Sequence, residues 1–180
     1  MRSDFLKTYQ MIEKYETADP NELVFKEKML EFISACDDCF LRSCAVGHFT
    51  SSAFLLNKDK SHVCLMHHAK LNKWMQLGGH CDGDWDILNV AIKEAREESG
   101  IKNIKPIKYD IFDIDIHLIP PSSKDHAHYH FDVRFLLHAC DDDTLIRNHE
   151  SNELKWVKKA SQDIPLNVVR MFKKLEELSF

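Results

Sequence analysis

The sequence lacks the features that mark three broad classes of protein. It contains no uncharged apolar run approaching the roughly 20 residues that a transmembrane helix needs, and its first residues, Met1 to Asp4, do not open a signal peptide. Its six cysteines are scattered without a disulfide framework, which is typical of reduced thiols. A net charge of −5 provides no basic surface for nonspecific nucleic-acid binding, although it does not exclude a nucleotide substrate. We therefore expect a cytoplasmic protein that does not insert into a membrane.

The length of 180 residues suffices for one domain with a sizeable core, or for one domain with a small extension. The first part predicts two helices, over about residues 4–15 and 22–39, separated by Asp19-Pro20-Asn21. Strands are predicted from residue 48 onward, at residues 52–57 and 62–67. We therefore expect an N-terminal helical extension packed on the core (1–45) and a main domain (46–180), and the extension leaves a homodimer open.

Three glutamates on one predicted helix are the most informative feature of the sequence. Glu94, Glu97 and Glu98 lie at i, i+3 and i+4, so their carboxylates share one helical face. Three like charges repel one another, whereas a divalent cation such as Mg²⁺ turns that repulsion into a binding site and keeps positions open for phosphate. The pair Gly78-Gly79 before the helix permits a tight turn in which a backbone carbonyl approaches the same ion.

The spacing around these glutamates resembles the Nudix box, which runs Gly, five residues, Glu, seven residues, then Arg-Glu-apolar-any-Glu-Glu-any-Gly-apolar. The box here extends from Gly79 to Ile101. Two positions depart from the pattern, because Trp85 stands where the first Glu is expected and Lys93 where the Arg is expected. Lys93 keeps the positive charge but loses the planar fork of arginine, and Trp85 removes one carboxylate. The positions that match are Gly79, Glu94, Ala95, Glu97, Glu98, Gly100 and Ile101.

The resemblance implies a Nudix hydrolase, an α/β protein with an α/β/α sandwich and a mixed sheet over roughly residues 50–178, plus the N-terminal helical extension. Such a pyrophosphohydrolase cleaves the diphosphate linkage of a small-molecule nucleoside diphosphate derivative by water attack at phosphorus, with Mg²⁺ or Mn²⁺ as cofactor. Glu97 and Glu98 are then implied as catalytic residues. The implied metal ligands are the carbonyl of Gly78 and the carboxylates of Glu94, Glu97 and Glu98.

A glutamate later in the chain is a further candidate. Nudix proteins often carry a glutamate in the loop before a Leu-x-Trp-Val strand, and residues 154–157 have that sequence. The resemblance therefore implies Glu150, or failing it Glu153, as an extra metal ligand or general base. Residues 164–178 predict an amphipathic helix that closes the chain.

Two segments after the glutamate helix predict a β-hairpin with many polar groups on one face. Residues 109–119 and 126–137 alternate in polarity on either side of a predicted turn at residues 120–125. With the turn centred between residues 122 and 123, the register puts three polar pairs and Arg134 on one face. The predicted pairs are His117 with His128, Asp115 with His130, and Asp113 with Asp132.

Three interpretations of this hairpin stay open at this point. It could be a solvent-facing surface of Asp–His pairs, or it could hold a transition metal, since His-x-His on a strand presents two imidazoles together. It could also be the floor of a substrate cleft, with substrate-binding residues His117, His128, His130 and Arg134.

Two alternatives to the hydrolase follow from these features. One is a metalloprotein centred on the His/Asp hairpin. The other is a Nudix-fold nucleotide-binding module without catalysis, which the departures at Trp85 and Lys93 favour and the intact Glu94, Glu97 and Glu98 disfavour.

Overall fold

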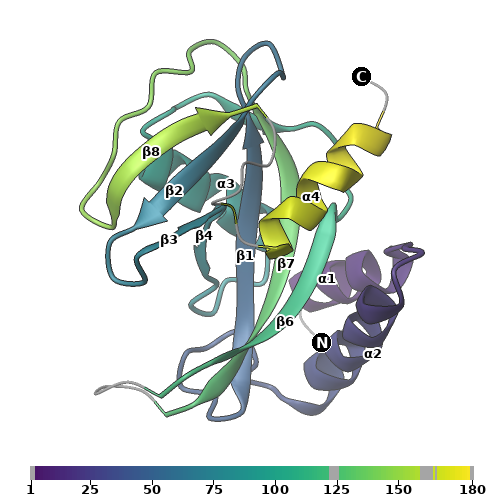
Figure 1. The fold of residues 1–180 in the computed structure, drawn as a ribbon. Helices are drawn as coiled ribbons and strands as arrows, with labels where there is room; N and C mark the ends of the chain where they lie inside the picture. Colours follow the sequence, from purple (N-terminus) through teal and green to yellow (C-terminus); the bar gives the residue numbers. More distant parts are fainter. Residues whose placement is uncertain (1–2, 122–125, 159–163, 165, 179–180) are drawn as a thin grey trace. The chain divides into compact units, whose positions relative to one another are not determined.

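Helices and strands of the predicted kinds occur along the chain in a computed structural model that describes residues 3–121, 126–158, 164 and 166–178 (Figure 1). The helices are α1 (Ser3–Lys14), α2 (Pro20–Ala35), α3 (Ile87–Ser99) and α4 (Leu166–Glu177). The strands are β1 (Gly47–Leu56), β2 (Val63–His68), β3 (Lys73–Met75), β4 (Leu77–His80), β5 (Ile104–Pro106), β6 (Asp113–Ile119), β7 (His128–Ala139) and β8 (Ser151–Val157). The N-terminal helices, the glutamate helix and the closing helix are all present.

Hydrogen bonds join the strands in the order β3-β2-β1-β7-β5, with β4 paired to β1, β6 to β7 and β8 to β2. The chain forms two compact units. Unit 1 contains residues 1–52, 79–91 and 108–135, and unit 2 contains residues 53–78, 92–107 and 136–180. Each unit is therefore built from segments far apart in the sequence.

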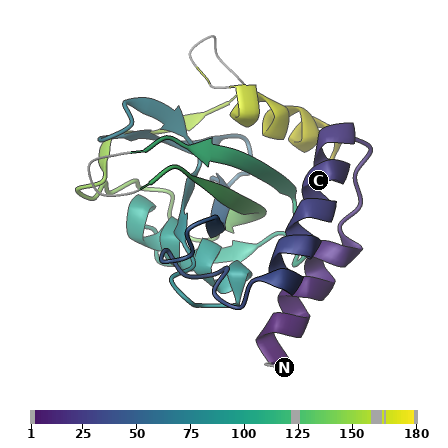
Figure 2. The ribbon, with the colours of Figure 1, turned by 90° about the horizontal axis from the view of Figure 1, so that it is seen from below.

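The N-terminal helices α1 and α2 lie side by side in unit 1 (Figures 1 and 2). Helix α2 begins close to the predicted position because the side chain of Asp19 accepts hydrogen bonds from the N–H groups two and three residues later, and Pro20 opens the first turn. It ends at Ala35, before the predicted end at Cys39, since Cys36 already has an extended backbone.

Aromatic rings form the core of unit 1 between α2 and the strands. The ring of Phe32 on α2 stacks on Phe131 of β7 with centroids 4.2 Å apart. On β1, the ring of Phe49 stacks on Phe40 with centroids 4.7 Å apart. Such pairs add about 0.5–1.5 kcal/mol to the free energy gained by burying the rings. The helical extension thus contributes directly to this core.

The hairpin of β6 and β7 in unit 1 corrects the predicted register. His117 pairs with His130 and Asp115 with Asp132, whereas the predicted register pairs His117 with His128 and Asp115 with His130. The error is a shift of two residues, because the predicted pairing depended on an assumed turn centre, and residues 122–125 of that turn lie outside the described part of the chain. A shift of two keeps every side chain on its face of the sheet. The shared polar face therefore survives the correction.

Strand β2 is central in unit 2. It pairs antiparallel with β8 from Val63 opposite Val157 to His68 opposite Ser151, and with β3 on residues 66–68. The first four residues of β2 are buried. The ring of Phe54, near the end of β1, meets that of Phe172 on α4 edge-on at 5.1 Å, which anchors the closing helix by its apolar face.

Local sequence sets both ends of α3. Asp86 precedes the helix, and its carboxylate accepts a hydrogen bond from the N–H of Asn89 at 3.2 Å. Gly100 follows the helix with φ of +77°, a left-handed conformation that favours glycine. A Cβ atom there would also lie 2.6 Å from the Cβ of Ile146. The helix that carries the three glutamates is therefore well delimited.

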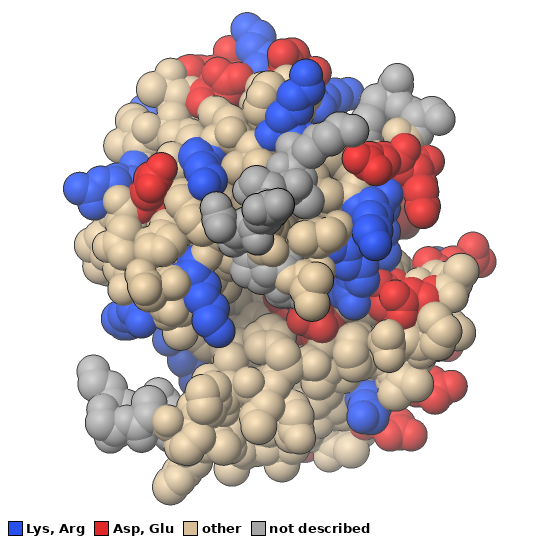
Figure 3. Space-filling view, in the orientation of Figure 1, with Lys and Arg blue, Asp and Glu red and all other residues tan. Residues whose placement is uncertain are grey.

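Charged side chains of both signs are interspersed on the face seen in Figure 3. Among the described residues, no helix is both long enough and apolar enough to cross a membrane.

Candidate active site

The three glutamates of α3 lie in different environments, although their spacing places them on one helical face. Glu98 is buried, with 2% of its surface exposed. The side chain of Glu94 is 15% exposed and that of Glu97 is 57% exposed. All three belong to unit 2. The face thus runs from a buried carboxylate to one that solvent reaches.

The buried carboxylate of Glu98 is strongly perturbed. Its pKa is raised to about 8, mainly by burial and in part by the neighbouring charges of Glu94 and Glu150, whereas a hydrogen bond from the backbone acts to lower it. The bond comes from the N–H of Gly78, which donates to Glu98 Oε2 at 2.8 Å and favours the charged form. The structure therefore brings Gly78 and Glu98 together through a hydrogen bond from the N–H of Gly78. The role of the Gly78 carbonyl as a metal ligand stays a prediction.

Lys93 lies beside the other two helix glutamates. Burial raises the pKa of Glu94, and Lys93 acts in the opposite direction. The Nζ of Lys93 is 3.5 Å from Oε1 of Glu94 and 3.9 Å from Oε1 of Glu97. The lysine that replaces the expected arginine still places a positive charge between two carboxylates.

Glu150 belongs to the same electrostatic cluster, because its charge raises the pKa of both Glu94 and Glu98. Its carbonyl accepts a hydrogen bond from the N–H of Ala69 at 2.9 Å, and its own N–H donates to Oδ1 of Asn148 at 2.9 Å. The loop that carries Glu150 is therefore tied to the end of β2. Glu153, the alternative base, lies within strand β8 instead.

These carboxylates fit a divalent cation. Burial raises the pKa of Glu94 and Glu98, the charges of Glu97 and Glu150 raise it as well, and a cation would relieve that repulsion. A donor set made of carboxylate oxygens suits a hard ion such as Mg²⁺ or Mn²⁺. Unit 2 thus gathers the five residues predicted as ligands or catalytic groups: Gly78, Glu94, Glu97, Glu98 and Glu150.

A family model of the NUDIX domain matches residues 48–170, well over half of the chain. The chain belongs to the Nudix family. The resemblance of the box is therefore confirmed, and a Nudix-type pyrophosphohydrolase is confirmed at the level of the family. No curated protein matches the chain.

Solved structures confirm the fold of this Nudix protein. A Caenorhabditis elegans Ap4A hydrolase in a binary complex is similar with a TM-score of 0.58 and 16% identity, covering 72% of this chain and 95% of its own. A NUDIX family hydrolase from Clostridium perfringens has a TM-score of 0.56 and 27% identity, with coverages of 73% and 98%. A UDP-X diphosphatase has a TM-score of 0.51 and 17% identity, with coverages of 97% and 95%. The predicted α/β class with a mixed sheet and N-terminal helices is confirmed.

Trp85, which stands in place of the first glutamate of the Nudix box, packs against the N-terminal part of the chain within unit 1. Its ring lies 4.3 Å from that of Phe40 and 5.4 Å from that of Phe5, measured between centroids. Its carbonyl accepts a hydrogen bond from the hydroxyl of Thr8 on α1. The departure from the family pattern is therefore explained by packing against the helical extension.

Restoring the family residue with Trp85→Glu is expected to lower the free energy of unfolding by about 2 kcal/mol or more, because it removes two ring contacts and places a charge against Phe5 and Phe40. Urea unfolding followed by circular dichroism measures the change. Trp85→Phe is the matched control and should lose less than about 1 kcal/mol, since a ring remains. Equal stability of wild type and Trp85→Glu would contradict the packing role.

The residues predicted to bind substrate lie in unit 1, where the structure gives Arg134 a particular environment. Arg134 is fully buried. Its Nε lies 2.7 Å from a carboxylate oxygen of Asp132. One terminal nitrogen, Nη1, lies 2.9 Å from Asp113, and the other, Nη2, lies 2.9 Å from Asp115. Burial acts to lower the pKa of Arg134, but the three carboxylates outweigh it and hold that pKa above its usual range. This geometry favours a structural role for Arg134 over contact with a substrate.

The three predicted histidines lie together in a larger cluster of imidazoles. The ring of His130 lies 5.4 Å from that of His117 and 5.2 Å from that of His128, measured between centroids. Burial, with the neighbouring His80 and His117, lowers the pKa of His130 to about 2. At neutral pH this ring is therefore uncharged, which disfavours a simple ion pair with a phosphate group.

His48 is a member of this cluster that the sequence pattern does not predict. Burial, with the neighbouring His80 and His128, lowers its pKa to about 4. Its ring centroid lies 4.9 Å from those of both His128 and His130. No local pattern around His48 identifies it, because its neighbours come from another strand far along the chain.

Proposed function

We propose that this Nudix protein hydrolyses the diphosphate linkage of a nucleoside diphosphate derivative. The observation that carries the proposal is the buried carboxylate of Glu98, whose pKa is raised to about 8. A divalent cation, Mg²⁺ or Mn²⁺, would offset this perturbation, held by Glu94, Glu97, Glu98 and the carbonyl of Gly78. Two structural neighbours, an Ap4A hydrolase and a UDP-X diphosphatase, support a substrate with linked phosphates.

When bound, the cation would neutralise the diphosphate and lower the pKa of a water molecule. The chain's own residues position and complete this chemistry. The N–H of Gly78 orients the carboxylate of Glu98, and Lys93 places its charge beside Glu94. Glu150 accepts the proton of the attacking water, because its side chain is 48% exposed and its loop is tied down by hydrogen bonds.

We also propose that residues 1–45 form the helical extension and 46–180 the Nudix domain. The family model begins at residue 48, which supports this division. The UDP-X diphosphatase neighbour covers 97% of the chain, so a similar extension exists elsewhere with this fold. A cytoplasmic location and a homodimer stay predictions.

Phosphate release from a panel of nucleoside diphosphate derivatives, read through a coupled phosphatase with Mg²⁺ or Mn²⁺, tests the proposal. We expect turnover of one class of compound, and a decrease of about 100-fold in kcat for Glu150→Gln, because the variant lacks the general base. Glu153→Gln is the matched control and should retain activity, since Glu153 lies within β8.

Two outcomes would contradict parts of this proposal. Equal losses in Glu150→Gln and Glu153→Gln would remove Glu150 as the specific base. No turnover of any compound, with nucleotides still binding by calorimetry, would contradict the hydrolase and support a Nudix-fold binding module.

A further inference from the structure

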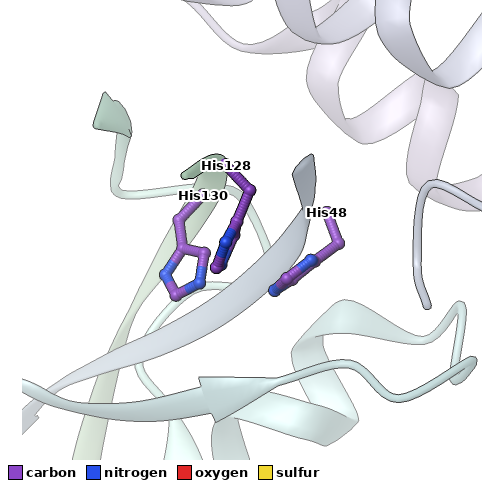
Figure 4. A group of neighbouring side chains, drawn as sticks. All are labelled: His48, His128 and His130. Carbon is purple, nitrogen blue, oxygen red and sulfur yellow. The ribbon is translucent and has the colours of Figure 1, made fainter. Parts of the chain in front are cut away.

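Three histidines of unit 1 direct ring nitrogens toward one point. His48 comes from β1, and His128 and His130 come from β7, where their spacing of two puts both on one face. Figure 4 shows the three imidazoles turned toward one another. One ring nitrogen of each lies within 4.8 Å of those of the other two.

Two of these rings bury nitrogens for which the described residues provide no hydrogen-bond partner. His48 is only 2% exposed, and neither of its ring nitrogens has a hydrogen-bond partner among the described residues. The same holds for Nε2 of His130 within the described part of the chain. A buried polar atom without a partner is costly and uncommon in native proteins. A metal ion that takes one lone pair from each ring would remove part of this cost.

The third ring is oriented as metal-bound histidines usually are. Nδ1 of His128 lies 2.8 Å from the backbone carbonyl of His126. A carbonyl only accepts, so Nδ1 carries the proton and Nε2 presents its lone pair. A hydrogen bond from the second ring nitrogen to a carbonyl is a common means of orienting a metal ligand.

We propose that His48, His128 and His130 form a binding site for a divalent transition metal, best suited to zinc. Zn–N bonds of about 2.0–2.1 Å in a tetrahedral site separate the ligand nitrogens by roughly 3.3 Å. The observed separations reach at most 4.8 Å, so small rotations of the side chains close the site. Three protein ligands leave one position for water or for a group of a bound molecule.

The chemistry of the donors separates this site from the carboxylate site of α3. Imidazole nitrogens favour zinc, nickel, cobalt and copper, whereas Mg²⁺ favours oxygen. The ring centroid of His80 lies 5.0 Å from those of both His48 and His130, so a fourth imidazole lies beside the site. The proposal does not depend on the hydrolase activity, because its residues belong to unit 1 and the glutamates to unit 2.

Metal binding by the full-length protein tests this site directly. The protein is incubated with Zn²⁺ in the presence of excess Mg²⁺, which occupies carboxylate sites, and bound zinc is then measured by elemental analysis and competition with a chromophoric chelator. We expect one zinc per chain, and a loss of affinity of at least about 100-fold in His48→Gln and in His128→Gln. His62→Gln is the matched control, because the hydrogen bond between His62 and Ser61 lies at an exposed position.

The thiols need a control of their own, since Cys36 Sγ lies 3.0 Å from Asp38 Oδ1 and 3.3 Å from Cys44 Sγ. Zinc binding that disappears in Cys36→Ser but persists in His48→Gln would overturn the proposal, as would the absence of tight binding in the wild type.

Cobalt spectra provide a readout that does not rely on any variant folding. With Co²⁺, a site made of imidazoles shows visible d–d absorption and no sulfur-to-cobalt charge-transfer band. An intense charge-transfer band would assign the metal to thiols and overturn the proposal.

Discussion

Glu98→Gln is expected to abolish hydrolysis and, at the same time, to stabilise the metal-free protein. The loss of one carboxylate ligand removes several kcal/mol of transition-state stabilisation, so kcat/KM should fall by about 10³-fold or more. The gain in stability arises because the wild type buries a carboxylate whose pKa is raised to about 8. Glutamine keeps an oxygen that can accept the hydrogen bond from the N–H of Gly78. One residue therefore serves the reaction and opposes folding.

The pH dependence of this gain follows from the raised pKa. Between the usual glutamate pKa of about 4.5 and the folded value of about 8, the folded protein binds a proton that the unfolded chain has released. The contribution of Glu98 to stability is therefore fully present below about pH 4.5, is lost as the pH rises toward 8, and stays lost above it. Glu98→Gln should match the wild type at low pH and exceed it by about 1–3 kcal/mol at pH 7–9.

Urea unfolding in the presence of EDTA, measured from pH 5 to pH 9, checks both the size and the sign of this difference in stability between Glu98→Gln and the wild type. Glu97→Gln is the matched control, because the side chain of Glu97 is 57% exposed and an exposed substitution should change stability by less than about 0.5 kcal/mol. A Glu98→Gln variant that is less stable than the wild type at pH 8 would show that the buried carboxylate is satisfied without a metal.

Arg134→Met is expected to destabilise the protein by about 3–5 kcal/mol, because it leaves buried carboxylates without their cation. Asp113 is fully buried and Asp132 is 2% exposed, and both lie within 3 Å of the guanidinium. The hydroxyls of Thr50 and Ser52 donate to Asp132 at 2.9 and 2.8 Å, so the network reaches into β1. For a chain of this length the loss corresponds to roughly 10 °C in Tm.

Thermal and urea unfolding measure this loss, with Arg42→Met as the matched control. Arg42 forms a two-bond ion pair with Asp82 at the surface, where such a pair contributes less than about 1 kcal/mol. Adding Asp113→Asn and Asp132→Asn to Arg134→Met should recover part of the stability, since it removes the uncompensated charges. If Arg134→Met is no worse than Arg42→Met, the buried network does not hold β6 and β7 together.

The hairpin shows why the sequence predicts the face on which each side chain lies but not the residue that it pairs with on the neighbouring strand. Alternation along β6 and β7 assigns each side chain to a face, and that assignment depends only on the strand itself. The register depends on where the chain turns, and the observed pairing of His117 with His130 differs from the predicted one by two residues. The same polar groups therefore lie on one face, but different pairs meet.

Trp85 shows a different limit of the sequence. Against the family pattern it is a lost carboxylate, which weakens the case for catalysis. Within unit 1 it contacts the rings of Phe5 and Phe40 and the hydroxyl of Thr8, and all three precede the Nudix domain. A pattern of one family cannot contain the reason, because the reason lies in an extension outside that pattern.

The family and the carboxylate face of α3 follow from the amino-acid sequence alone, since helical spacing places Glu94, Glu97 and Glu98 together whatever surrounds the helix. The burial of Glu98 and the exposure of Glu97 could not be predicted in this way, because burial depends on which side of the helix the rest of the protein covers. The meeting of His48 with His128 and His130 likewise depends on the folded chain, since strands far apart in the sequence bring their imidazoles together.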